Sequence, residues 1–146
     1  MHSGNQNGLD SAPQWQVHET KECRPDDMRK LYITGDWWED DWDAEHLKKI
    51  VEMSFAFVVA EAADGSWIGM GRLISDGVSD AYLQDIVVLS EWEGQGIGTA
   101  IVRSLLEICN RNGITWIGTI AAPRTEYFYR KFGFAKMNGY TPMRFE

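Results

Sequence analysis

Three glycines at alternate positions, Gly94, Gly96 and Gly98, form the segment of this chain that is best suited to binding an anion. Glycine has no side chain, so such a loop lets the backbone approach a ligand closely. An apolar run at residues 86–89 precedes the glycines, and a segment with helical periodicity follows at residues 100–112. A helix N-terminus presents free N–H groups and the positive end of the helix dipole. The sequence therefore predicts a phosphate cradle made of backbone atoms rather than lysine.

Two familiar nucleotide-binding loops do not fit this segment. The dinucleotide fingerprint needs a third glycine at a position that Thr99 or Ile101 occupies here, depending on which glycine is taken as the first. A Walker loop needs Gly-Lys-Ser or Gly-Lys-Thr, and neither tripeptide occurs in the sequence. A flexible connection between a strand and a helix, with no ligand, is the alternative to the cradle.

A second segment, residues 128–134, reads Phe-Tyr-Arg-Lys-Phe-Gly-Phe. Together with the strand, glycine loop and helix, it resembles the GNAT N-acetyltransferase superfamily. In that family, the loop that holds the pyrophosphate of acetyl-CoA has a signature. It reads Arg or Gln, two residues of any type, Gly, one residue of any type, and then Gly or Ala. Gly96 and Gly98 match this signature. Residues 128–134 are similar to the F-Y-x-K-x-G-F segment that closes the other side of the CoA site.

Two positions depart from the family's pattern. Glu93 stands where the family usually has Arg or Gln, and a carboxylate that points at a pyrophosphate repels it. We therefore expect Glu93 to face solvent while backbone amides hold the anion. Ala122 occupies a position where many members have an Asn that helps to hold the cofactor.

The resemblance implies which residues bind acetyl-CoA. One strand of the family pairs with the pantetheine arm through its backbone, and the N–H of Val88 is a candidate to polarise the acetyl carbonyl. The alternative is that these residues form a buried strand that binds no ligand. The implied cofactor-binding residues are Ile86, Val87 and Val88 on that strand, and Gly94, Gln95, Gly96, Ile97, Gly98 and Thr99 in the loop.

The resemblance also suggests a general acid and a general base. Tyr129 occupies the family's tyrosine position, and a phenol with a pKa of about 10 can protonate a departing thiolate. A purely structural aromatic is the alternative for Tyr129. Asp85 and Asp76 are the carboxylates nearest in sequence to the pantetheine-pairing residues, and we choose Asp85 as the base, acting through a water molecule. The alternative for Asp85 is a carboxylate that a neighbouring Arg or Tyr satisfies.

The acceptor side has a separate set of candidates. Residues 36–43 contain three tryptophans and five carboxylates, a composition that suits a cationic amine, since each cation–π contact contributes about 0.5 to 2 kcal/mol. We take Trp37 and Trp38 as substrate-binding residues, together with Arg72 and Asp76 from the strand beside the cofactor strand and the turn after it. A solvated acidic loop anchored by its tryptophans is the alternative.

The apolar periodicity and turn signals predict the elements that position these residues. Their order favours an α/β or α+β fold with a mixed, mostly antiparallel sheet and helices on both faces, which is also the order of the GNAT fold. Asp43 is a candidate N-cap. The expected strands are 15–20, 55–62, 66–75, 81–89, 114–120, 134–137 and 142–145, and the expected helices are 25–35, 44–53, 100–112 and 124–132.

Size and composition set the remaining expectations. The 146 residues fit a single domain at 15–146, preceded by a disordered tail at 1–14. No apolar run approaches the length of a membrane span, and the N-terminus lacks the apolar region of a signal peptide. Cys23 and Cys109 make neither a disulfide framework nor a metal site, so we expect a cytoplasmic protein without a metal. The net charge of −8 argues against nucleic acid as a partner and favours a cationic substrate.

The residues and the resemblance together imply an acetyl-CoA-dependent N-acetyltransferase. We expect it to transfer the acetyl group to a primary amine of a small cationic molecule by direct attack in a ternary complex. One alternative is a catalytically weak domain that binds or senses acyl-CoA, because Glu93 and Ala122 depart from the pattern. Another is a dinucleotide-binding protein, on the glycines alone. The resemblance is also compatible with a homodimer.

Overall fold

A five-stranded sheet forms the centre of the computed structural model, which describes residues 14–146. The strands are β1 (Trp15–Glu19), β2 (Ala56–Ala62), β3 (Trp67–Ser75), β4 (Asp80–Val88) and β5 (Trp116–Thr119). They lie in the sheet in chain order, and neighbouring strands are antiparallel except β4 and β5, which are parallel. The mixed, mostly antiparallel sheet is therefore confirmed. Residues 1–13 of the predicted tail lie outside the described residues.

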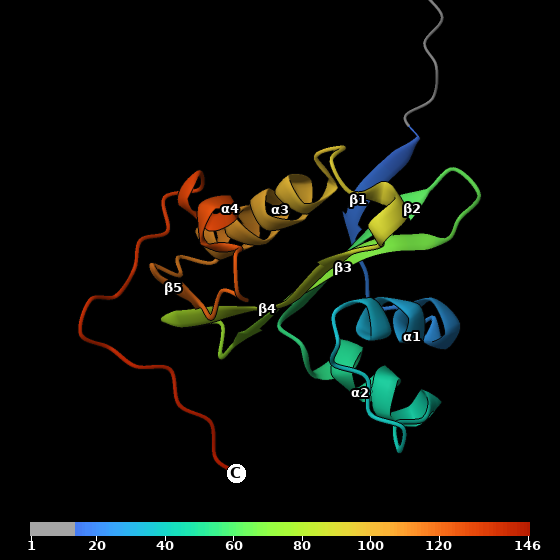
Figure 1. The fold of residues 1–146 in the computed structure, drawn as a ribbon, viewed down its shortest axis with the longest axis horizontal. Coiled ribbons are helices and arrows are strands. Elements are labelled where there is room, and N and C mark those ends of the chain that lie inside the picture. Colours follow the sequence, from blue (N-terminus) through green and yellow to red (C-terminus); the bar gives the residue numbers. More distant parts are fainter. Residues whose placement is uncertain (1–13) are drawn as a thin grey trace, which may run out of the picture.

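Helices cover both faces of the sheet, as predicted (Figure 1). They are α1 (Pro25–Thr34), α2 (Ala44–Met53), α3 (Ile97–Arg111) and α4 (Glu126–Arg130), with a short 3₁₀ turn at Ser90–Trp92 before the glycine loop. Helices α1 and α2 lie on one side, and α3 and α4 lie on the other. The predicted N-cap of α2 is confirmed, since Asp43 Oδ1 accepts a hydrogen bond of 2.9 Å from the backbone N–H of His46.

The alternation of side chains along β2 explains why both faces are covered. Phe57 and Val59 point into the cluster beneath α1 and α2, whereas Ala56, Val58 and Ala60 point into the cluster beneath α3. All five are fully buried. Complete burial of a large apolar side chain contributes about 1.5 to 3 kcal/mol, so β2 stabilises both layers at once.

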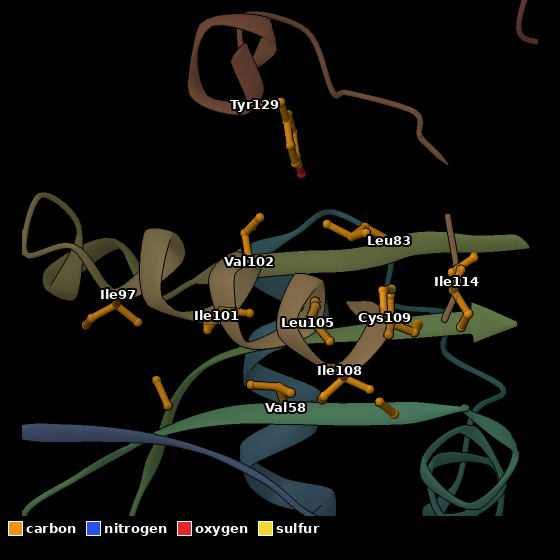
Figure 2. Packing of buried hydrophobic residues seen from close by; sticks show 14 of the residues in the cluster. Val58, Leu83, Ile97, Ile101, Val102, Leu105, Ile108, Cys109, Ile114 and Tyr129 are labelled. Carbon is orange, nitrogen blue, oxygen red and sulfur yellow. The ribbon is translucent and has the colours of Figure 1, made fainter. Parts of the chain in front are cut away.

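Helix α3 packs closely against the sheet because β3 carries a glycine beneath it. A Cβ atom at Gly71 would lie 2.6 Å from Ile86 Cδ1 and 2.8 Å from Ile101 Cγ2. Real Cβ atoms do not approach other atoms so closely, and a side chain here would push α3 outward. The face of α3 that fills this layer, shown in Figure 2, consists of Ile97, Ile101, Val102, Leu105, Ile108 and Cys109.

The predicted closing strands are wrong. Residues 134–137 and 142–145 have no strand structure, and the large side chains of Tyr140, Met143 and Phe145 are 75%, 89% and 100% exposed. Apolar and aromatic residues favour a strand only where they pack on a neighbouring strand, and these segments pair with no described strand. Helix α4 also begins later than predicted, because Arg124 adopts the left-handed conformation with φ +67°.

Three further observations bear on the broad class of protein. No helix within residues 14–146 is both long and apolar enough to cross a membrane. The thiols of Cys23 and Cys109 form no disulfide. Across the same residues, no three His, Cys, Asp or Glu side chains are grouped as a metal ion would require.

Candidate active site

A cleft of about 600 Å³ opens where the glycine loop meets β4 and α4. Its walls are the end of β4, the loop, the first turn of α3 and one face of α4. Eight of the nine predicted cofactor-binding residues line the cleft, and Gln95 does not. The eight are Ile86, Val87, Val88, Gly94, Gly96, Ile97, Gly98 and Thr99.

The backbone of β4 is unpaired on one edge beside this cleft. Strand β5 pairs with β4 from Asp80 to Leu83 and no further. Val87 and Val88 pair with β3 on the other side, opposite Met70 and Gly69. An extended ligand can therefore form strand-like hydrogen bonds with the free edge of β4.

A β-bulge at Asp85 redirects β4 at the point where it leaves β5. Asp85 has φ +56°, and the pairing register between β3 and β4 shifts beside it, between Met70 and Arg72. Its Oδ2 accepts hydrogen bonds of 2.7 Å from the Tyr32 hydroxyl and of 2.7 Å from Arg72 Nε. Burial and the Asp85 charge raise the pKa of Tyr32, so its hydroxyl stays protonated as the donor. Side-chain hydrogen bonds thus hold the bulge in place.

These contacts give Asp85 and Arg72 a partner in each other. Their side chains are 16% and 19% exposed, and neither residue lines the cleft. The arrangement matches the alternative that we set beside the general base, a carboxylate satisfied by a neighbouring Arg or Tyr. It also gives Arg72 a structural partner instead of a substrate.

The glycine loop has the geometry of an anion cradle. Gly94 and Gly96 have φ +79° and +84°, a region that residues with side chains rarely adopt. A Cβ at either position would meet no atom within 4 Å, so open space lies above both. The N–H groups of Ile97, Gly98 and Thr99 donate to no other group within the described part of the chain. The loop and helix end therefore fit the pyrophosphate of a CoA molecule.

Tyr129 reaches from α4 into the interior. It is 9% exposed, lines the cleft, and belongs to the core cluster beneath α3. Figure 2 shows its hydroxyl oxygen directed toward the layer of Val102 and Leu83. Burial raises the pKa of Tyr129, while a hydrogen bond with Thr119 acts in the opposite direction. The phenol therefore remains protonated at neutral pH, as a proton donor must.

The cleft also contains residues that we did not predict from the sequence. Thr34, at the end of α1, and Phe128 and Lys131, in or just after α4, line its wall. Lys131 Nζ donates a hydrogen bond of 2.7 Å to Thr99 Oγ1 in the first turn of α3. The lysine of the F-Y-x-K-x-G-F segment was a sequence signal for Lys131, whereas nothing in the sequence marked Thr34.

The structure does not bring the predicted acceptor residues to this cleft. Trp38 lines a second, smaller groove of about 360 Å³ that also contains Trp42, at the N-terminal ends of α1 and α2. Thr34 reaches the cleft from the opposite end of α1. Trp37 packs edge-on against Tyr32 with the ring centroids 6.3 Å apart.

Asp76 lies in the turn between β3 and β4, at the end of β4 farthest from Val88. Its Oδ1 accepts hydrogen bonds from the N–H groups of Val78 and Ser79, at 2.8 and 3.3 Å. The sequence placed Asp76 near the cofactor strand because the two are close in the chain. The carboxylate instead stabilises the turn.

Comparison with known families decides what this arrangement is. The family model described as an acetyltransferase (GNAT) domain matches residues 54–136, more than half of the chain. The chain belongs to the GNAT acetyltransferase family. The matched residues run from just before β2 to beyond α4, and they contain all of the cleft except Thr34. The family is one of acyltransferases, and acetyl-CoA is the cosubstrate that the family implies.

Individual relatives agree with this assignment. Serotonin N-acetyltransferase 2 of Oryza sativa subsp. japonica, named as chloroplastic, is 32% identical over 94 residues, 62% of this chain and 47% of that protein. The uncharacterized N-acetyltransferase ycf52 of Pyropia yezoensis is 26% identical over 101 residues, 65% of this chain and 58% of that one. The chain thus spans about half the length of these curated relatives.

A solved structure supports the fold of the GNAT domain. A probable acetyltransferase from meticillin-resistant Staphylococcus aureus superposes with a TM-score of 0.78 at 24% identity. The superposition covers 90% of this chain and 98% of the other. The sheet and the helices on its two faces are therefore those of a GNAT fold.

Proposed function

We propose that this GNAT domain transfers the acetyl group of acetyl-CoA to a primary amine of a small cationic molecule. The observation that carries the proposal is one cleft lined by the free edge of β4, the glycine cradle and Tyr129. In that cleft the first turn of α3 would hold the pyrophosphate, and the backbone of Val87 and Val88 would pair with the pantetheine arm. Acetyl-CoA supplies the activated thioester.

The transfer proceeds by direct attack in a ternary complex. The amine nitrogen attacks the acetyl carbonyl, a C–N bond forms, and the C–S bond breaks. Tyr129 gives its phenolic proton to the departing thiolate. Water in the open cleft takes the proton that the ammonium loses before the attack, since neither Asp85 nor Asp76 lines the cleft. The second proton, which the nitrogen loses after the C–N bond forms, returns through water to the Tyr129 phenolate.

Two observations favour a cationic acceptor. The net charge of −8 raises the local concentration of cations around the protein. The rice relative is named for serotonin, whose side chain ends in a primary amine that is protonated at neutral pH. A homodimer and a cytoplasmic location stay predictions beside this proposal.

A thiol-release assay tests the proposed activity. Purified protein is mixed with acetyl-CoA and one amine in each assay, and free CoA thiol is measured. The amines are serotonin, a polyamine, an amino sugar and free lysine. We expect amine-dependent thiol release with at least one amine. CoA binding without turnover across a broad amine panel would favour the acyl-CoA sensor. Thermal stabilisation by NAD but not by CoA would contradict the proposal.

Asp85→Asn separates a structural role from a general base. Asparagine tolerates the left-handed conformation and keeps an oxygen that accepts from Tyr32 or Arg72. We expect kcat to stay within about tenfold of the wild-type value, because removal of a true general base lowers kcat about 10²-fold to 10⁴-fold. Thermal unfolding should show a loss of about 1 to 3 kcal/mol, since the charge-assisted bond with Arg72 weakens. A hundredfold fall in kcat with unchanged stability would restore Asp85 as the base.

A further inference from the structure

The cleft contains one positively charged side chain. Among the lining residues that the structure describes, Lys131 is the one lysine or arginine. Its Nζ lies 2.7 Å from Thr99 Oγ1, although the two residues are 32 positions apart in the chain. The same Nζ lies 4.6 Å from the ring centroid of Phe128 and 5.3 Å from that of Phe132. Aromatic faces attract a cation, so these rings favour the ammonium group at this place.

The ammonium group stands at the end of α3 that presents the free N–H groups. Thr99 is the third residue of that helix, after Ile97 and Gly98. A lysine has three N–H donors, and Thr99 accepts from one of them, which leaves two for other acceptors. A phosphate oxygen seated on the first turn of α3 is therefore within reach of Lys131 Nζ.

The charges that line the cleft favour such a cation. Glu93 is the one carboxylate among the described lining residues, at the position where the family's signature has Arg or Gln. Its charge opposes a pyrophosphate that approaches the loop. Backbone N–H groups and the helix dipole offer partial charges only. A full positive charge from elsewhere in the fold offsets Glu93.

We propose that Lys131 supplies the charge that the glycine loop lacks and binds the pyrophosphate of CoA together with the first turn of α3. This inference rests on the proposed function, because it assumes that CoA occupies the cleft. It assigns the phosphate-binding cation to the chain after α4 instead of to the loop. The cradle then has two walls, and the bound anion joins them.

Binding measurements on Lys131→Gln test the assignment without reference to catalysis. Calorimetry gives the Kd for CoA, for dephospho-CoA, which lacks the 3′-phosphate, and for pantetheine, which lacks all phosphates. We expect Lys131→Gln to weaken CoA and dephospho-CoA alike by about tenfold and to leave pantetheine unchanged. Lys131→Arg, which keeps the charge, should stay within about threefold of the wild type.

Lys136→Gln is the matched control. It removes the same charge from a lysine that is 67% exposed, pairs with Glu126 and does not line the cleft. We expect it to bind CoA like the wild type. The loss in Lys131→Gln should also shrink as salt rises from about 0.05 M to about 0.5 M, since screening weakens an exposed charge contact.

Each other outcome overturns a defined part of the inference. Equal CoA affinity in Lys131→Gln and the wild type removes Lys131 from the site. A loss confined to CoA moves its contact to the 3′-phosphate, and a loss shared by pantetheine makes its role structural. Failure of the wild type to bind CoA overturns the proposed function, and Lys131's role with it.

Discussion

Gly96→Val is expected to weaken CoA binding by at least about tenfold, or about 1.4 kcal/mol. Gly96 has φ +84°, and the position of its missing Cβ is open space above the cradle. A valine there places its methyl groups where a phosphate would sit on the N–H groups of Gly98 and Thr99. The Kd for CoA from calorimetry measures the effect.

Gly113→Val provides the control for backbone strain. Gly113 lies after α3, has φ +69°, and its Cβ would also meet nothing within 4 Å. Both variants should lose about 1 to 2 kcal/mol of folding free energy, because a branched residue is forced into the left-handed region. Gly113→Val should bind CoA normally. If Gly96→Val also binds CoA normally, the pyrophosphate lies elsewhere.

Tyr129→Phe is expected to lower kcat about a hundredfold while the Kd for CoA changes by less than about twofold. Phenylalanine keeps the ring that packs beneath α3 and removes the hydroxyl that we propose protonates the thiolate. Because the pKa of Tyr129 is raised by burial, the wild-type phenol is protonated throughout the neutral range. The wild-type kcat should therefore show no alkaline fall from this group below about pH 10. Steady-state kinetics across pH provide the measurement.

Tyr127→Phe is the matched control for this prediction. Tyr127 belongs to the same helix but is 83% exposed, with Arg130 over its ring. Its hydroxyl does not line the cleft, so kcat should not change. An unchanged kcat in Tyr129→Phe as well would leave Tyr129 as a core aromatic, the alternative that its burial also fits.

Local patterns were sufficient to predict most of the fold. Apolar runs between turn signals indicated most of the strands, and apolar spacing indicated the face of α3, because each depends on residues a few positions apart. The prediction of closing strands at residues 134–137 and 142–145 was wrong because it, too, used local residues alone. Their residues favour a strand, but strand formation depends on a partner that the local sequence does not reveal.

In the site, too, the features that depend on nearby residues were predictable, and those that depend on distant residues were not. The glycine loop and the tyrosine of α4 were predictable, because each lies in a compact motif. The sequence offered a neighbouring Arg or Tyr at Asp85 only as an alternative and named neither donor, since Tyr32 is 53 positions away and Arg72 is 13 positions away. Nothing local indicates that these two donors meet on a single carboxylate oxygen, or that the Asp85 backbone bulges there.

The early end of β5 has a consequence for hydrogen exchange along β4. Amides near Asp80 to Leu83 lie between two paired strands, whereas the edge of Val87 and Val88 that faces away from β3 is open to water. One strand is therefore expected to exchange its amide hydrogens slowly in its first half and quickly at the outward-facing positions of its second half. Saturation with CoA should slow the second half selectively, and this would report how the ligand occupies the sheet edge while the protein remains folded.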